Sequence, residues 1–213
     1  MKKVLLENLS NIPDHIIDST ILAIIAHKEM YDINVPYRWT VDKGWNKSPD
    51  WGFPISNMKH WKTPNELQDW PDLYFENLML PYIYPKIKEW IEVNKPQYKD
   101  VKFHTQSCWY LIYKNENKEN TSVPVHNHKG QGRRTTGLNQ EECCSGVFYL
   151  NAPNSPTRTF EYYCDDGKKT TIHPKTKDVV LFSTDMNHAA DESGPSPESM
   201  VIAFNVLFYK EKQ

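Results

Sequence analysis

The sequence of 213 residues has few cysteines and no long apolar run. Its four cysteines include no pair in C-x-x-C spacing, which is typical of reduced thiols in a cytoplasm. No apolar run approaches the roughly 20 residues that a membrane-spanning helix needs. The charged N-terminal segment is unlike a signal peptide. We therefore expect a soluble cytoplasmic protein without a membrane partner.

The sequence also lacks a strong excess of either charge. Lysine and arginine number 25 against 27 aspartates and glutamates, so the formal charge is −2. Such a balance gives no global attraction for phosphate backbones, and nucleic acid is not favoured as a partner. What the chain does contain is apolar mass, with 38% hydrophobic and 13% aromatic residues. At this length that is enough for the core of one domain.

The N-terminal part carries helical and irregular patterns. Isoleucine and leucine recur at helical spacing over residues 11–30, which predicts a helix with one buried face. A second helix is expected from Thr63 onward, kinked or divided by Pro81 and Pro85. Between the two helices, residues 31–62 hold four tryptophans in weakly periodic sequence. Such loops either line a substrate cleft or cover the edge of the domain.

The pattern changes to strands in residues 101–210. Helices followed by about seven short strands with polar turns indicate an α+β fold with an antiparallel barrel or sandwich. The sequence shows neither an internal repeat nor a linker, so residues 1–213 are expected to form a single domain in which residues 1–100 support the strand-rich core. The expected strands are Val101–Tyr113, Val123–His128, Ser145–Asn151, Thr157–Cys164, Thr170–His173, Asp178–Ser183 and Met200–Tyr209.

Three histidines stand where strands bring distant residues together. His126 and His128 are two residues apart in a predicted strand, so their imidazoles project from the same face. The apolar strand Asp178–Ser183 runs into a polar turn that delivers His188. These three side chains make one triangular face, which leaves the other positions of a mononuclear metal open for chemistry. The remaining five histidines have no partner at ligand spacing and are expected to be structural or at the surface.

Four segments in a fixed order give the chain a family resemblance. They are His126-Asn127-His128, then Ser145 to Leu150 (S-G-V-F-Y-L), then Leu181-Phe182 with His188, and then Phe204-Asn205. This order resembles the 2-oxoglutarate and iron(II) dependent oxygenases, and is most similar to a group found in phages and marine bacteria. The resemblance covers residues 101–210 and implies a double-stranded β-helix, or jelly roll. It also implies a metal held at the mouth of the barrel by His126, His128 and His188.

The resemblance implies an activity as well. Such an enzyme uses iron(II), 2-oxoglutarate as cosubstrate and dioxygen, and it releases succinate and carbon dioxide while it hydroxylates a small molecule or a peptide side chain. The metal ligands His126, His128 and His188 would then also be the catalytic residues. The expected state is a monomer or homodimer in the cytoplasm, or in the host cytoplasm if the chain is phage-encoded.

The chain departs from the wider family first at His128, where a carboxylate is usual. Three neutral imidazoles leave the iron unit at +2, and a 2-oxoglutarate dianion would neutralise the site completely. Because close relatives also carry H-x-H, His128 is the preferred ligand. A carboxylate elsewhere stays open as an alternative, and the candidates are Asp185, Asp191, Glu141 and Glu142.

The second departure is Ser199, where the family has an arginine that binds the far carboxylate of 2-oxoglutarate. A serine donates one neutral hydrogen bond and cannot balance that charge, so another cation must do so if 2-oxoglutarate is used. Arg158 is the first candidate, followed by Lys168, Lys169 and the pair Arg133-Arg134. The predicted cosubstrate-binding set is Arg158, Tyr149, Ser199 and Asn205, although Tyr149 is most simply a core or pocket aromatic.

Residues 129–142 form a glycine-containing insertion beside the predicted metal. The segment either closes over the substrate as a lid, with Arg133 or Arg134 meeting an anionic group, or is a solvated surface loop. Two alternative functions also stay open. The all-histidine set and the missing arginine favour a cupin-like dioxygenase or isomerase without 2-oxoglutarate, although the glutamate of cupins is absent. The other alternative is a jelly-roll binding module without catalysis.

Overall fold

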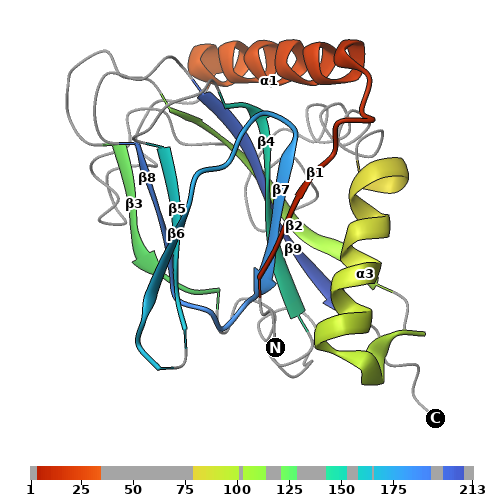
Figure 1. Ribbon diagram of the computed structural model, residues 1–213. Coiled ribbons are helices and arrows are strands. Elements are labelled where there is room, and N and C mark those ends of the chain that lie inside the picture. The colour runs from red at the N-terminus through yellow and green to blue at the C-terminus, as the bar shows by residue number, and fades with distance from the viewer. Residues whose placement is uncertain are drawn as a thin grey trace.

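The computed structural model describes residues 4–34, 79–100, 103–113, 121–128, 143–152, 158–164, 166–192 and 199–208. Strands make up most of its elements (Figure 1). The helical segments are α1 (Asp14–Asn34), the π-helical turn η2 (Met79–Ile83), α3 (Tyr84–Asn94) and the 3₁₀ turn η3 (Pro96–Tyr98). The strands are β1 (Val4–Asn8), β2 (Phe103–Tyr113), β3 (Thr121–His126), β4 (Cys143–Asn151), β5 (Arg158–Tyr163), β6 (Lys169–Ile172), β7 (Asp178–Ser183), β8 (His188–Glu192) and β9 (Ser199–Phe208). The predictions for residues 35–62, for the beginning of the second helix and for the insertion 129–142 fall outside the described residues.

The strand pairs are nested inside one another. β2 pairs with β9, β3 with β8, β4 with β7, and β5 with β6, and all four pairs are antiparallel. A chain that pairs in this order is a long hairpin folded back on itself, which is how a jelly roll is built. The pairing is therefore consistent with the predicted jelly-roll core.

The strands form two sheets that face each other (Figure 1). The larger sheet has the order β1-β7-β4-β9-β2, and the smaller one has the order β3-β8-β5-β6. Because successive side chains of a strand point to opposite faces, the larger sheet contributes to two apolar clusters. The outer cluster joins it to the helices and includes Leu181, Phe204, Ile17, Ile87 and Trp90. The inner cluster fills the space between the sheets and includes Val180, Phe182, Tyr149, Val201 and Phe160.

Seven strands match the predicted segments, whereas β1 and β8 are not predicted. The prediction that helices precede all strands is wrong, because β1 lies before α1 and pairs with β7 at the edge of the larger sheet. The sequence of β8 is His-Ala-Ala-Asp-Glu, which carries no strand signal of its own. Its conformation follows from pairing on both sides, with β3 and with β5. Strand propensity depends strongly on such context.

Both long helices begin at or next to a proline. α1 starts at Asp14, directly after Pro13, and α3 has Pro85 in its first turn. Proline is tolerated there because the first N–H groups of a helix have no partner within the helix. Pro85 therefore marks the beginning of α3. In the part of the chain that the structure describes, no helix has the length and apolar character needed to cross a bilayer.

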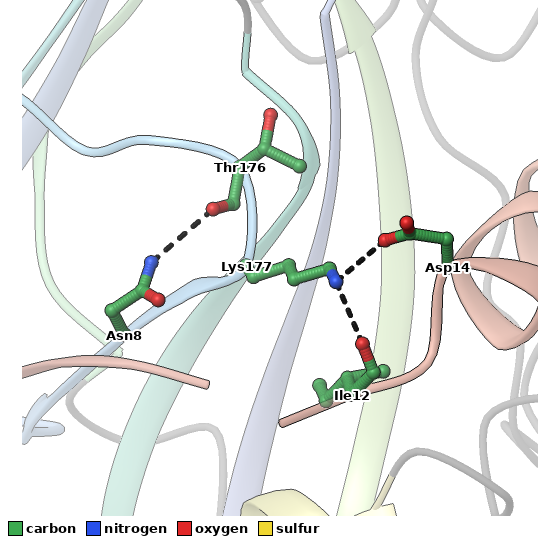
Figure 2. Close-up of polar contacts among 5 residues, drawn as sticks. All are labelled: Asn8, Ile12, Asp14, Thr176 and Lys177. Atoms are coloured by element: carbon green, nitrogen blue, oxygen red, sulfur yellow. Dashed lines mark hydrogen bonds and ion pairs between the residues drawn. The ribbon is translucent and has the colours of Figure 1, made fainter. Parts of the chain in front are cut away.

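The turn before β7 holds the N-terminal segment against the larger sheet. Lys177 in this turn has φ of 70°, and its Nζ donates hydrogen bonds of 2.6 Å to the carbonyl oxygen of Ile12 and to Oδ1 of Asp14 (Figure 2). Nearby, Nδ2 of Asn8 donates to the carbonyl oxygen of Thr176 at 3.3 Å. The backbone N–H of Lys177 donates to the carbonyl oxygen of Tyr149 in β4. This turn thus fixes β1 and the start of α1 against the strand that leads to His188.

Gly146 explains the glycine of the S-G-V-F-Y-L segment. It lies opposite Phe204 of β9 and Leu181 of β7, and an added Cβ would overlap the ring of Phe204 and lie 2.8 Å from Cδ2 of Leu181. We expect Gly146→Ala to lower the free energy of unfolding by about 1 to 3 kcal/mol, the usual cost of overpacking a core. Chemical denaturation measures this change.

A second variant separates the clash from other effects of the substitution. If the ring of Phe204 is the obstacle, Phe204→Leu should cost less in the Gly146→Ala background than in the wild type, so the two losses are not additive. A rise in stability for Gly146→Ala, as expected where alanine only restricts the unfolded chain, would show that no clash exists.

Candidate metal centre

Three imidazoles converge at one end of the two sheets. His126 is the last residue of β3, His128 follows two residues later, and His188 is the first residue of β8. One nitrogen of each ring lies within 4.8 Å of the others, and no carboxylate of the described residues belongs to the group. Nε2 of His126 and Nε2 of His128 are 3.3 Å apart. Two nitrogens that bind one ion at about 2.1 Å have a similar separation, so the spacing fits a shared metal.

The local backbone differs from the prediction in one respect. The sequence predicts His126 and His128 on one strand, but β3 ends at His126, opposite His188 in the register. His128 is held from another side, because its backbone N–H donates a 2.8 Å hydrogen bond to the carbonyl oxygen of Thr184 in the turn after β7. The imidazoles converge although only one of the two belongs to the strand.

The cluster is also more deeply placed than the mouth of a barrel implies. His128 and His188 have exposed fractions of 6% and 5%, and His126 is half-buried. The ring of His188 lies 4.5 Å from that of Phe182 and 5.6 Å from that of Phe160, measured between centroids. Phe182 of the apolar strand β7 and Phe160 of β5 thus form an aromatic wall against the ring of His188.

Hydrogen bonds decide which nitrogen of each buried ring is available. Nδ1–H of His188 donates to the carbonyl oxygen of Met186 at 3.0 Å, so Nε2 carries the lone pair. Nδ1 of His128 lies 2.7 Å from Oδ1 of Asn205 and 2.9 Å from Oγ of Ser145. Oδ1 of Asn205 can only accept, so Nδ1 of His128 is the donor and Nε2 is again free of a proton. A ligating histidine commonly donates its second N–H in this way.

Burial keeps these two rings neutral. Burial, opposed by the hydrogen bond to Asn205 and supported by the charge of His126, lowers the pKa of His128 to about 4. Burial is also the largest cause for His188, where the charges of His126 and His128 add to it and lower the pKa to about 3. Neutral imidazole is the form that binds metal, so near pH 7 these two rings need not lose a proton before they bind one.

The lowered pKa values predict that the metal-free protein is sensitive to acid. In the unfolded chain both rings titrate near 6.5, so below that pH the unfolded state binds more protons than the folded state. The stability from these neutral rings is therefore fully present above about pH 6.5 and is lost as the pH falls. The expected loss between pH 7 and pH 5 is up to about 2 kcal/mol for each ring. Urea denaturation at the two pH values measures it, and His188→Gln should show a smaller loss than the wild type.

The four predicted cosubstrate-binding residues are all buried, but the structure gives them different surroundings. Arg158, the first residue of β5, has an exposed fraction of 3%. It precedes Phe160 by two residues, so both side chains project from the face that carries the inner cluster. Tyr149 belongs to that cluster. Ser199, at the start of β9, lies two residues before the cluster member Val201, so its side chain projects from the same face.

Asn205 lies six residues after Ser199 in β9, and its side chain is hydrogen-bonded to His128. Ser145 is not among the predicted site residues, but its Oγ–H donates a hydrogen bond to Oδ1 of Asn205 at 2.6 Å. The signal was present in the sequence, because the S-G and F-N segments contain these two residues. Spacing alone could not show that they meet.

The alternative candidates are distributed as follows. Lys168 and Lys169 are exposed and form ion pairs with Asp166 at 3.2 Å and Glu161 at 2.8 Å. Asp185 is exposed and is not a member of the metal-binding group. The alternatives Arg133, Arg134, Glu141, Glu142 and the side chain of Asp191 lie outside the described part of the structure.

The sequence matches no protein-family model and no curated protein sequence. Solved structures, in contrast, are similar over nearly the whole chain. A prolyl-4-hydroxylase from Pseudomonas putida is 13% identical, with 97% of this chain and 93% of that chain covered and a TM-score of 0.59. A prolyl hydroxylase from Trichoplax adhaerens, in complex with a peptide fragment of hypoxia inducible factor, is 11% identical, with 98% and 84% covered and a TM-score of 0.56.

A third similar structure is a non-heme α-ketoglutarate dependent carbocyclase, SnoK from nogalamycin biosynthesis. It is 9% identical, with 96% of this chain and 79% of that chain covered and a TM-score of 0.61. At these identities the similarity establishes the fold. The three-imidazole cluster therefore lies in a chain whose fold is that of prolyl hydroxylases and of an α-ketoglutarate dependent carbocyclase.

Proposed function

We propose that the protein is a mononuclear iron(II) oxygenase that uses 2-oxoglutarate, the compound also called α-ketoglutarate. The observation that carries the proposal is the convergence of three imidazoles, two of them held neutral with Nε2 unprotonated, in this fold. His126, His128 and His188 would hold the metal. Bound iron would couple the oxidation of 2-oxoglutarate by dioxygen, giving succinate and carbon dioxide, to the insertion of one oxygen atom into a C–H bond of the substrate.

The donor set suits both the metal and the cosubstrate. Imidazole nitrogen is a good ligand for iron, and three donors on one side leave positions for other ligands. An imidazole that binds a metal is neutral, so three such donors would leave the metal its full +2 charge. A dianion such as 2-oxoglutarate balances that charge, which favours it over a neutral ligand in a buried site.

We assign the far carboxylate of 2-oxoglutarate to Arg158. The guanidinium of Arg158 is a permanent cation whose forked N–H groups suit a carboxylate, and by the strand register its side chain lies on the same inner face as that of His188. Tyr162 pairs with His188 in the register, and Arg158 is four residues earlier in β5, a separation of roughly 13 Å between Cα atoms. The long arginine side chain and a five-carbon diacid together can bridge that distance. Ser199 and Tyr149 would add neutral hydrogen bonds at the same end.

Two of the structural neighbours indicate a class of substrate. One structural neighbour is seen with a peptide and another acts in the biosynthesis of nogalamycin. We propose a peptide side chain or a small molecule as the substrate, hydroxylated at a C–H bond that the residues around the metal hold in place while they exclude water.

One experiment tests the function and separates it from its alternatives. Protein loaded anaerobically with iron(II) should bind 2-oxoglutarate and, after dioxygen is admitted, release succinate, with more release when a true substrate is present. Iron binding and dioxygen consumption without affinity for 2-oxoglutarate would favour a cupin-like three-histidine dioxygenase, which the all-imidazole donor set also fits. Iron binding without dioxygen consumption would leave a non-catalytic binding module.

A further inference from the structure

We infer that Asn205, itself fixed by Ser145, is the positioning residue that makes His128 a metal ligand. Because the side chain of Asn205 is a neutral amide, it does this without adding negative charge to the metal site. The inference rests in part on the proposed function, because it concerns the same metal centre. It adds a role for two residues that touch neither the metal nor the cosubstrate in that proposal.

The hydrogen bonds leave one consistent arrangement of protons. The hydroxyl of Ser145 has a single proton, and at 2.6 Å from Oδ1 of Asn205 that proton is donated to the amide oxygen. Oδ1 also accepts from Nδ1–H of His128 at 2.7 Å, and Oγ of Ser145 is a second acceptor for the same N–H at 2.9 Å. The exposed fractions are 0% for Ser145, 3% for Asn205 and 6% for His128. Water therefore cannot easily replace either acceptor, and the tautomer is fixed.

The position of His128 in the chain explains why such a hold is needed. β3 ends at His126, so strand pairing orients that ring but does not orient His128. Ser145 and Asn205 are register partners on β4 and β9, adjacent strands inside the five-stranded sheet. Because β4 and β9 are each paired on both sides, the backbone of these two residues is held firmly in place. His128 thus takes its direction from the larger sheet, although its backbone belongs to a segment that leaves the smaller one.

The group that accepts the hydrogen bond from His128 also affects the charge of the metal site. Many ligating histidines donate to a carboxylate, which raises the basicity of the ligand. Here the acceptor is a neutral amide, and it stands behind a histidine at the position where a carboxylate could have been the ligand. Asparagine and aspartate have nearly the same shape. Replacing one by the other changes the charge of the site and leaves its geometry almost unchanged.

Three variants test the inference, with cobalt(II) as the metal probe and anaerobic iron(II) as the second. Asn205→Leu should weaken metal affinity by about 10- to 100-fold, the usual effect of losing such a partner, and Ser145→Ala should weaken it less. Asn205→Asp should keep or increase metal affinity and weaken 2-oxoglutarate binding at least about tenfold, because a negative charge then faces the dianion. Val206→Ala is the matched control. It lies next to Asn205 on the helix-facing side of β9 and should lower stability without changing metal affinity.

Nitrogen-15 NMR of the metal-free protein reads the tautomer directly. The wild type, Val206→Ala and Asn205→Asp should show His128 protonated at Nδ1, and Asn205→Leu should not. An Nε2–H tautomer of His128 in the wild type, or wild-type cobalt affinity in folded Asn205→Leu, would overturn the inference. If Asn205→Leu does not fold, the near-isosteric Asn205→Asp and the small change Ser145→Ala still decide it. Failure of the wild type to bind 2-oxoglutarate would overturn the proposed function but not the tautomer result.

Discussion

Replacing His188 by alanine is expected to lower iron(II) affinity by more than about 100-fold, beyond the 10- to 100-fold cost of losing an outer partner. The variant removes one of three protein donors, and no described carboxylate stands close enough to take its place. His126→Ala and His128→Ala should have the same effect. Anaerobic titration with iron(II) measures the loss.

The burial of the cluster shapes the design of that experiment. His188 packs against Phe160 and Phe182, so alanine leaves a cavity and lowers stability as well. His188→Gln keeps most of the volume and should also fail to bind iron. His15→Ala is the matched control, because it removes an exposed imidazole on α1. Full iron affinity in His128→Ala would point to a carboxylate ligand outside the described residues, such as Glu141 or Glu142.

Replacing Arg158 by alanine is expected to raise the dissociation constant of 2-oxoglutarate by about 10- to 1,000-fold while iron affinity stays unchanged. A hydrogen bond to a charged group contributes roughly 1.5 to 3 kcal/mol, and the fork of arginine can make two. Arg158→Lys should recover part of the affinity, since lysine keeps the charge but loses the bidentate geometry. Calorimetry or a competition assay on the iron-loaded protein measures both variants.

Lys168→Ala is the control for charge alone, because the side chain of Lys168 is 82% exposed. It should bind 2-oxoglutarate as the wild type does. Normal binding by Arg158→Ala together with weak binding by a variant at Arg133 or Arg134 would move the anchor into the insertion. If the wild type itself has no affinity for 2-oxoglutarate, that result would favour the cupin-like alternative.

The cluster of three histidines could be predicted from the sequence because each histidine has a recognisable local context. The spacing of His126 and His128, and the apolar strand before His188, are short-range signals. The support for those ligands could not be predicted, since Ser145 and Asn205 are 60 residues apart and meet only through the register of β4 and β9. The sequence pattern groups Asn205 with the cosubstrate residues, and the structure adds a hydrogen bond between its side chain and His128.

The strands also divide into those that the local sequence predicts and those that it does not. β7 is predicted because Val179 to Phe182 are buried on both faces and form a continuous apolar run. β8 is not predicted, because its small and polar residues are extended only between two partners. β1 is a short edge strand, and its partner stands near the other end of the sequence. Pairing of that kind leaves no local pattern.

The pairing of β1 with β7 has a consequence for how the protein is made. Asn8 hydrogen-bonds to Asp178 across 170 residues of sequence, so a ribosome must synthesise nearly all of the described chain before β1 meets its partner. In the same way, β2 cannot pair with β9 until residues 199–208 have been synthesised. Nascent chains with such distant contacts gain little from vectorial synthesis. The larger sheet, whose register brings Ser145 and Asn205 together beside His128, therefore cannot be complete until β9, the last of the described strands, has been synthesised.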